Sequence, residues 1–324
     1  IDHNILLRKL KTLDVSPVLV GWIAAFLTNR QQAVKIGDIS EWRTLKGGIP
    51  QGTKLGVILF AVMTNDLIID WRLRIKFVDD TTALEIIPRN SISLLNHAAT
   101  DIHEFASTHN MKLNPGKCKE MFINFMHDHN ILVNPIVLGN KEIECVTNYK
   151  LLGVYLNEDL SWNTHIDYIF KNACKRLYSL RILKRAAVAS LNILKVYLTI
   201  IRPILEYAVP VWQSISDTWS DKLETIQKRA LKIIFPFAET YFEALEVAGI
   251  DNLTDWRTII CKKYMSRMKI SPNHPLHALL PKNTGENCNY ELRDKTEDVL
   301  LYQDFRFRFC RTKKTENLFT FKYY

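Results

Sequence analysis

Two adjacent carboxylates, Asp79 and Asp80, stand between two short runs of β-forming residues. Apolar and polar side chains alternate from Leu73 to Val78, which predicts a strand, and the β-rich run from Thr81 to Ile86 predicts its partner. The sequence therefore predicts a hairpin with both carboxylates at its tip. Like charges this close repel each other, and a divalent cation held by their oxygens would offset the repulsion. The alternative is an ordinary turn, in which Asp is a common residue.

A glycine-rich loop, Gly47 to Gly56, precedes the carboxylates and leads into an apolar segment, Val57 to Met63, that predicts a helix. Thr53 is a candidate cap for that helix. Glycine lets a backbone approach a ligand closely, and the free N–H groups at a helix N-terminus suit phosphate. The loop is therefore a candidate contact for a phosphate-bearing ligand, and a tight turn before a helix is the alternative.

Four motifs resemble, in their order and spacing, those of the reverse transcriptases of non-LTR (LINE-like) retrotransposons. They are the glycine-rich loop, the hairpin Phe77-Val78-Asp79-Asp80, the segment Lys112 to Lys119 and the segment Asn148 to Leu156. Two further stretches, Ser161 to Ile166 and Pro203 to Trp212, are also similar to the family. The resemblance covers most of the chain. A different palm polymerase, such as an intron maturase or a telomerase relative, is another hypothesis.

The resemblance implies an RNA-directed DNA polymerase that transfers a nucleotide to a primer 3′ hydroxyl with the help of two Mg²⁺ ions. Asp79 matches the principal metal ligand of the family, and Asp80 matches its neighbour, which has a less direct role. Gln51 and Gly52 match a motif that contacts the incoming nucleotide and the template. The partners that the resemblance implies are an RNA template, a DNA primer and deoxynucleoside triphosphates.

Four further residues match functional positions of the family, each with a structural alternative. Phe77 stands where an aromatic residue contacts the primer end, and it could be a core residue of its strand instead. Lys117 matches a lysine that protonates the departing pyrophosphate or offsets its charge, and it could be a surface lysine in a Pro-Gly turn. Leu152 and Gly153 match the primer grip, for which a simple β-turn is the alternative.

A long basic segment follows these motifs, because eight basic residues and no acidic residue lie from Lys171 to Arg202. Six of them are candidate contacts to a nucleic-acid backbone: Lys171, Lys175, Arg176, Arg181, Lys184 and Arg185. A helix that is basic on one side and apolar on the other can lie along a row of phosphates. A solvated helix face is the alternative.

The composition favours a polyanionic partner. The 324 residues carry a formal net charge of +9 and a pI of about 9.1, which suits nucleic acid or an anionic membrane surface. No apolar segment reaches the ~20 residues that a membrane-spanning helix needs, so we expect no membrane span. The six cysteines are scattered without metal-ligand spacing, and no secretion signal accompanies them. This pattern predicts reduced thiols in an intracellular protein.

The pattern of elements predicts an α+β fold, with a polymerase palm followed by a mostly helical thumb and a C-terminal region. The palm would hold an antiparallel sheet with helices on one face. We expect the palm over residues 1–156, the thumb-like domain over 157–236 and a region of uncertain role over 237–324. Within the palm, strands are expected at Glu120–Phe125 and Ile131–Leu138.

The first residues, Ile1-Asp2-His3, resemble the end of the family's first carboxylate motif, so the catalytic Asp of that motif would precede residue 1. We therefore expect an N-terminally truncated, incomplete copy that lacks the fingers and does not polymerise DNA on its own, because misplacing a reacting group by about 1 Å can cost on the order of a hundredfold in rate. The rival hypothesis is a catalytically dead relic that only binds nucleic acid.

Overall fold

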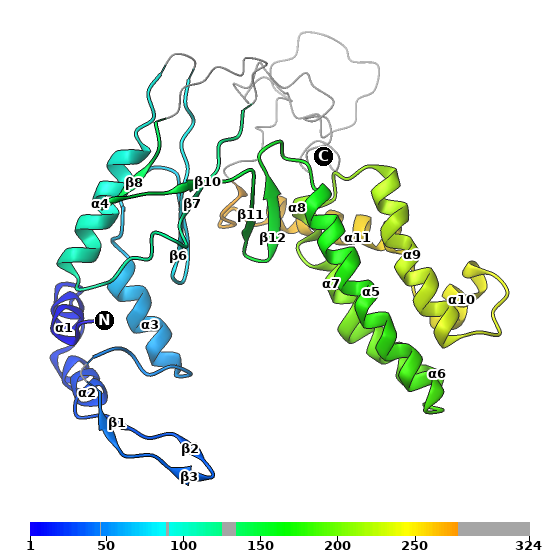
Figure 1. Cartoon of the computed structure of the whole chain (residues 1–324), viewed down its shortest axis with the longest axis horizontal. Helices are drawn as coiled ribbons and strands as arrows, with labels where there is room; N and C mark the ends of the chain where they lie inside the picture. The colour runs from blue at the N-terminus through cyan, green and yellow to red at the C-terminus, as the bar shows by residue number, and fades with distance from the viewer. Residues whose placement is uncertain (46, 89–90, 125–133, 278–324) are drawn as a thin grey trace. The chain divides into compact units, whose positions relative to one another are not determined.

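The computed structural model describes residues 1–45, 47–88, 91–124 and 134–277 (Figure 1). The chain divides into two compact units, the first formed by Ile1–Phe122 with Asp128–Val146 and the second by Thr147–Tyr324 with Ile123–His127. Helices and short paired strands occur together in the first unit, and helices dominate the second. This mixture agrees with the α+β class expected from the sequence.

Three helices build the main core of the first unit: α1 (His3–Thr12), α2 (Pro17–Leu27) and α3 (Lys54–Thr64). Their apolar faces meet around buried residues that include Leu6, Leu27 and Met63. Local side chains set where two of these helices begin. The Asp2 carboxylate caps α1, and the Thr53 hydroxyl caps α3 by accepting a bond of 3.0 Å from the Gly56 amide. The cap predicted at Thr53 is therefore confirmed.

A second, smaller core of the first unit forms where α4 (Leu95–Thr108) packs against a short strand. The described strands of this unit pair two by two. The pairs are β1 (Gln31–Gln32) with β4 (Arg43–Thr44), β2 (Lys35–Ile36) with β3 (Asp38–Ile39), β5 (Arg74–Phe77) with β6 (Asp80–Ala83), β7 (Lys119–Glu120) with β10 (Glu144–Cys145), and β8 (Val137–Leu138) with β9 (Lys141–Glu142). The β7–β10 pair is parallel, and the others are antiparallel.

The continuous antiparallel sheet expected for a palm is not formed among the described residues, because each ladder ends after two strands. The strand expected at 120–125 is confined to β7, and the one expected at 131–138 is confined to β8, with residues 131–133 outside the described part. Ladders of two residues make too few hydrogen bonds to build a sheet on their own. The apolar side chains Ile75 and Phe77 of β5 are 55% and 58% exposed, so nothing described here covers that side of the hairpin.

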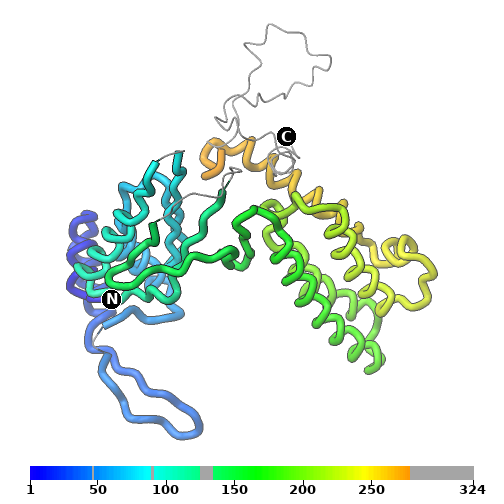
Figure 2. Tube along the Cα trace, turned by 45° about the horizontal axis from the view of Figure 1, so that its top comes forward, coloured from blue at the N-terminus to red at the C-terminus, as the bar shows by residue number. Residues whose placement is uncertain are grey.

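The second unit begins with a hairpin and continues as a helical bundle, as the sequence predicts for the region after residue 157. The hairpin strands are β11 (Asn148–Leu151) and β12 (Val154–Asn157). The helices are α5 (Asn163–Arg185), α6 (Ser190–Val196), the π-helix η1 (Tyr197–Ile201), α7 (Arg202–Glu206), α8 (Val209–Trp212), α9 (Asp217–Ile234), α10 (Tyr241–Ala248) and α11 (Leu253–Ile270). The helices α5 and α9 lie side by side along the bundle (Figures 1 and 2).

A buried polar network fixes the last helices on this bundle. The Tyr197 hydroxyl donates to the Gln227 side chain at 2.7 Å, and Gln227 donates to the Tyr241 hydroxyl at 3.0 Å. Tyr241 donates in turn to the Glu224 carboxylate, which also accepts the Leu253 amide at 3.1 Å. Glu224 thus satisfies a free N–H group at the start of α11. Burial raises the pKa of the Tyr197 and Tyr241 hydroxyls, so both remain donors.

The domain boundaries 1–156, 157–236 and 237–324 stay predictions. The two compact units meet in sequence between Val146 and Thr147, and buried residues of α10 and α11 belong to the same core as those of α5 and α9. Within the described residues, no helix combines the length and the apolar character that crossing a membrane requires.

His165 supplies a pH-dependent contribution to the stability of the second unit. Its ring is almost fully buried, and its Nδ1 accepts the Tyr155 amide of β12 at 3.4 Å. Burial, with a smaller effect of the Lys150 charge, lowers the pKa of His165 to about 4. The unfolded chain, with a His pKa near 6.5, therefore binds the proton first as the pH falls.

We expect this contribution to be fully present above pH ~6.5, to fall by about 2 kcal/mol at pH 5 and by about 3 kcal/mol below pH 4. Urea unfolding at pH 7 and pH 5 measures it. The variant His165→Gln keeps an acceptor for Tyr155 but cannot titrate, so its loss of stability between the two pH values should be smaller by that amount. An equal loss in both proteins would contradict the assignment.

Candidate functional site

The hairpin β5–β6 presents the carboxylate pair as the sequence predicts. Phe77 pairs with Asp80 across the ladder, so Val78 and Asp79 alone form the loop, and Asp80 opens β6. Val78 has a φ of +54°, as at the first loop position of a type II′ turn, which a β-branched residue rarely adopts. Both carboxylates are exposed. A strained turn that holds two charges in solvent is a feature that functional sites share.

Two basic side chains attach this hairpin to the C-terminal end of α3. Lys76 donates to the Thr64 carbonyl at 2.6 Å, and Arg74 donates to the Asn65 carbonyl at 3.1 Å and also to Leu67. Carbonyl groups at a helix C-terminus are unpaired and carry partial negative charge, which suits a cation. Burial lowers the pKa of Lys76. The hairpin is thus fixed to the same helix whose N-terminus follows the glycine-rich loop.

The glycine-rich loop is tied to the start of the chain. The Gly48 amide donates to the Ile1 carbonyl at 3.0 Å, and its own carbonyl bonds His3 Nε2 at 2.7 Å. Beyond this anchor, Gln51 and Gly52 lie exposed in the turn that precedes α3, and Gly52 has a φ of +79°. The structure therefore places both residues where a ligand could reach them.

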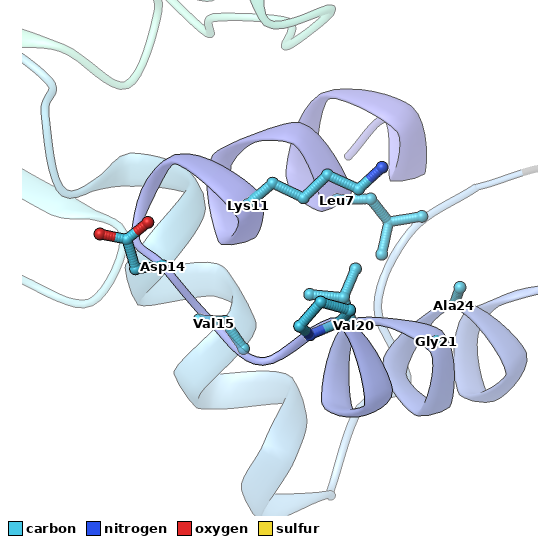
Figure 3. A pocket seen from close by; sticks show the side chains of 8 residues that line it. Leu7, Lys11, Asp14, Val15, Val20, Gly21 and Ala24 are labelled. Atoms are coloured by element: carbon cyan, nitrogen blue, oxygen red, sulfur yellow. The ribbon is translucent and has the colours of Figure 1, made fainter.

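Two concave surfaces of the described residues lie elsewhere in the first unit. One of about 720 Å³ is formed by α1 and α2, where Leu7 and Lys11 face Val20 (Figure 3). Neither this region nor a second cavity of about 370 Å³ is lined by Asp79 or Gln51. A cleft shared by those two residues stays a prediction.

Lys117 lies exposed in the turn after Pro115, and its amide donates to the Asn114 carbonyl at 3.0 Å. The loop that carries it borders the smaller cavity, which Lys112 and Lys141 also line. This placement fits a surface lysine and also leaves the ammonium group accessible to a phosphate, so the role of Lys117 stays a prediction.

The donor atoms at the β5–β6 turn suit a hard divalent cation. Mg²⁺ takes oxygen ligands and usually binds one or two carboxylates together with substrate phosphates. Asp79 and Asp80 supply such oxygens. Among the residues described, no group of three or more His, Cys, Asp or Glu side chains could hold a metal ion. The chemistry of the two carboxylates suits Mg²⁺, and a metal ion bound at this turn stays a prediction.

In the second unit, Leu152 and Gly153 form the two-residue loop of the β11–β12 hairpin. Their φ angles are +46° and +90°, and positive values at both positions define a type I′ turn. Asn-Gly is the favoured pair for this turn, whereas leucine is strained there. The loop is closed by Tyr207, whose hydroxyl donates to the Leu152 carbonyl at 2.7 Å.

Leu152→Asn should stabilise the second unit, because asparagine adopts the left-handed conformation at little cost and the leucine side chain is 41% exposed. We expect a gain of about 0.5–1 kcal/mol, measured by urea unfolding. The same exchange at Leu191, an exposed leucine of α6, is the control and should give no gain. A loss of stability in Leu152→Asn would show that contacts of the leucine outweigh the strain.

The six basic residues of α5 divide into two groups. Lys171 pairs with Asp167 at 2.5 Å, Arg176 donates to the Ile200 carbonyl at 3.0 Å, and Lys184 donates to the Ile234 carbonyl at 3.0 Å. These three charges have partners within the protein. The other three, Lys175, Arg181 and Arg185, are exposed. We call them the free basic face of α5, and they are the better candidates for contacts to phosphate.

Lys150 and Tyr168 join β11 to α5 through a contact that the sequence did not indicate. The Lys150 ammonium donates to the Tyr168 hydroxyl at 2.8 Å and lies 4.4 Å from its ring centroid. That hydrogen bond raises the pKa of Lys150 and lowers that of Tyr168. In the β11–β12 ladder Lys150 pairs with Tyr155. The alternation of side chains along the strands could have indicated this position for Lys150, but no sequence pattern indicates Tyr168 on α5 as its partner.

Comparison with known proteins covers both units. Residues 1–156 match the family described as Reverse transcriptase (RNA-dependent DNA polymerase). Over 84% of its length the chain is 26% identical to the RNA-directed DNA polymerase from mobile element jockey of Drosophila funebris, and it covers 31% of that protein. Over 72% of its length it is 25% identical to the probable RNA-directed DNA polymerase from transposon BS of Drosophila melanogaster, of which it covers 27%. No solved structure matches the chain significantly.

The chain spans between about a quarter and a third of the length of the curated relatives it matches. The matched family residues include the glycine-rich loop, the carboxylate hairpin and the Leu152–Gly153 turn. Similarity to the jockey protein runs over 290 residues and so continues into the helices of the second unit. Residues 1–156 are therefore similar to the reverse transcriptase family, and the similarity of the chain to the RNA-directed DNA polymerases of the jockey element and of transposon BS continues beyond them.

Proposed function

We propose that the chain is the palm and thumb portion of an RNA-directed DNA polymerase that extends a DNA primer on an RNA template. The observation that carries the proposal is the strained two-residue turn that presents Asp79 beside Asp80 within the residues matched by the family. The first unit would supply palm elements, and the helices after residue 157 would supply the thumb. Copying of a retrotransposon transcript takes place inside the cell, so we also propose an intracellular location.

Asp79 is proposed as the principal ligand of Mg²⁺ and Asp80 as its weaker neighbour. When bound, two such ions would supply the charge that activates the primer 3′ hydroxyl and stabilises the departing pyrophosphate. The exposed Gln51 and Gly52 would contact the incoming deoxynucleoside triphosphate and the template. Lys117 would donate a proton to the pyrophosphate or offset its charge.

Contacts to the primer and the template are proposed for both units. The Phe77 ring is exposed, which supports a contact with the primer end over the alternative of a core strand residue. In the second unit, the Leu152–Gly153 turn would approach the primer as its grip. The free basic face of α5 would contact backbone phosphates without regard to sequence.

Primer extension on an RNA template with Mg²⁺ tests the proposal. It should be measured with this chain and with a fusion polypeptide, in which the segments of the Drosophila funebris jockey protein outside the matched region are joined to this chain. Extension by the fusion polypeptide that depends on template, Mg²⁺ and all four deoxynucleotides is the expected result. A fusion polypeptide that folds and binds primer–template but adds no nucleotide would overturn the proposal.

The exposed Lys175, Arg181 and Arg185 favour a second candidate function, a relic that binds nucleic acid without catalysis. That protein would bind primer–template with a steep salt dependence, and its affinity would not change with Mg²⁺ or a matching nucleotide. Fluorescence anisotropy with and without the next deoxynucleotide separates the two functions, because a polymerase binds the primer end more tightly when the nucleotide completes the complex.

A further inference from the structure

Tyr207 reaches from the helical bundle to the turn of the β11–β12 hairpin. Its hydroxyl donates to the Leu152 carbonyl at 2.7 Å, although the two residues are 55 positions apart in the sequence. The ring also lies against Gly153, where an added Cβ atom would come within 3.2 Å of Tyr207 Cε1. The tyrosine is 55% exposed, so it gains little from burial. Its contacts are directed to the turn.

The turn needs such a contact because its conformation is unfavourable for its sequence. Leu152 holds a φ of +46°, which leucine avoids because its Cβ crowds the following carbonyl. Without a tertiary contact, a two-residue loop with leucine at its first position would sample other conformations. The Tyr207 hydroxyl binds the carbonyl group of Leu152, and its ring lies so close to Gly153 that a Cβ atom there would have to displace the ring by a few tenths of an ångström.

Tyr207 is itself rigidly placed by the core of the second unit. It ends α7, and its amide donates to the Pro203 carbonyl at 3.0 Å. Its carbonyl accepts the indole N–H of Trp212 at 2.8 Å, and Trp212 is fully buried. The backbone of Tyr207 is therefore anchored to a buried side chain, and its ring extends from that anchor to the hairpin turn.

We propose that Tyr207 is a positioning residue that holds the Leu152–Gly153 turn in the shape that receives the primer strand at its 3′ end. The inference rests on the proposed polymerase function and adds to it the residue that sets the geometry of the primer contact. The ligand is the sugar–phosphate backbone of a recessed primer terminus. A long duplex without such a terminus near the hairpin does not require the turn.

Tyr207→Phe in the full chain is the test, because it removes the hydroxyl and leaves the ring on Gly153. Tyr178→Phe on α5 is the control, since that ring is exposed and distant in sequence from the hairpin. Two quantities are measured. Amide hydrogen exchange of residues 151–155 reports the turn, and fluorescence anisotropy reports affinity for two probes of equal length, a DNA–RNA duplex with a recessed 3′ end and a blunt one.

In Tyr207→Phe we expect exchange at residues 151–155 to become at least about fivefold faster, while helical amides keep their wild-type rates. Affinity for the recessed probe should fall about three- to tenfold, which corresponds to the loss of one hydrogen bond. Affinity for the blunt probe should change less than about twofold. Tyr178→Phe should leave exchange at residues 151–155 and the ratio of the two affinities unchanged.

Three results would overturn the inference. Wild-type exchange at the turn in Tyr207→Phe would show that the hydroxyl does not hold it. Faster exchange with unchanged affinity for the recessed probe would show that the turn does not receive the primer. An equal loss for both probes would assign Tyr207 to general binding. If the wild-type chain bound neither probe, the proposed polymerase function itself would fail, while the exchange data would still decide whether Tyr207 holds the turn.

Discussion

Asp79→Asn is expected to lower Mg²⁺-dependent primer extension by the fusion polypeptide about a thousandfold or more. Asparagine keeps the size and polarity of the side chain but removes the negative charge that a hard cation needs. A correctly held metal ion contributes several kcal/mol to phosphoryl transfer, and each ~1.4 kcal/mol is a factor of ten in rate. Asp79 is exposed at the turn, so the exchange should not disturb folding.

Asp70→Asn is the matched control, because Asp70 is another exposed aspartate of the first unit and lies outside the carboxylate pair. Its extension rate should stay within about twofold of the unmodified protein. Single-turnover extension with saturating primer–template and nucleotide measures the chemical step. An Asp79→Asn protein that extends the primer as fast as the control would remove Asp79 from the metal site.

Reversing the free basic face of α5 should weaken nucleic-acid binding strongly. In the triple variant Lys175→Glu, Arg181→Glu and Arg185→Glu, we expect affinity for a primer–template duplex to fall about a hundredfold or more in low salt. Each lost phosphate contact also removes about 0.9 from the slope of log K against log salt, so the slope should decrease by up to about 3. Fluorescence anisotropy between 50 and 300 mM salt measures both quantities.

A variant with the same change of charge elsewhere serves as the control. Arg229, Lys232 and Lys262 are exposed residues of α9 and α11, and their replacement by Glu alters the net charge equally. If both triple variants lose the same affinity, binding depends on net charge and not on α5. An unchanged salt slope in the α5 variant would assign those residues to a solvated face.

Local features of the candidate site were predictable from the sequence. The alternation of apolar and polar side chains before Asp79 and the preference of Asp for turns predict the β5–β6 hairpin. Both signals depend only on a few neighbouring residues. The Thr53 cap is predictable for the same reason. The positive φ of Val78 and of Leu152 was not, since both residue types normally avoid that conformation and the surrounding structure imposes it.

Hydrogen-bond partners that lie far apart along the chain could not be predicted from the sequence. The charge pattern of α5 predicts six equivalent basic residues, but Arg176 and Lys184 bond carbonyl groups of Ile200 and Ile234, which no periodicity identifies. The hydrogen bond from the Tyr207 hydroxyl to the Leu152 carbonyl was likewise not predictable, because it forms only when the end of α7 packs against the hairpin. The strand patterns predict a palm sheet, whereas the described residues form short two-stranded ladders. Strand pairing depends on neighbouring strands, which local sequence patterns do not specify.

Iron-mediated cleavage of the backbone tests the central claim, that the β5–β6 turn holds the catalytic metal, most directly. Fe²⁺ binds oxygen ligands in place of Mg²⁺, and with peroxide it releases radicals that cut the chain next to the ion. In this chain, with primer–template and a deoxynucleotide present, we predict cleavage between Phe77 and Thr81 that excess Mg²⁺ suppresses and that Asp79→Asn abolishes. Cleavage elsewhere, or undiminished cleavage at this turn in Asp79→Asn, would contradict the account.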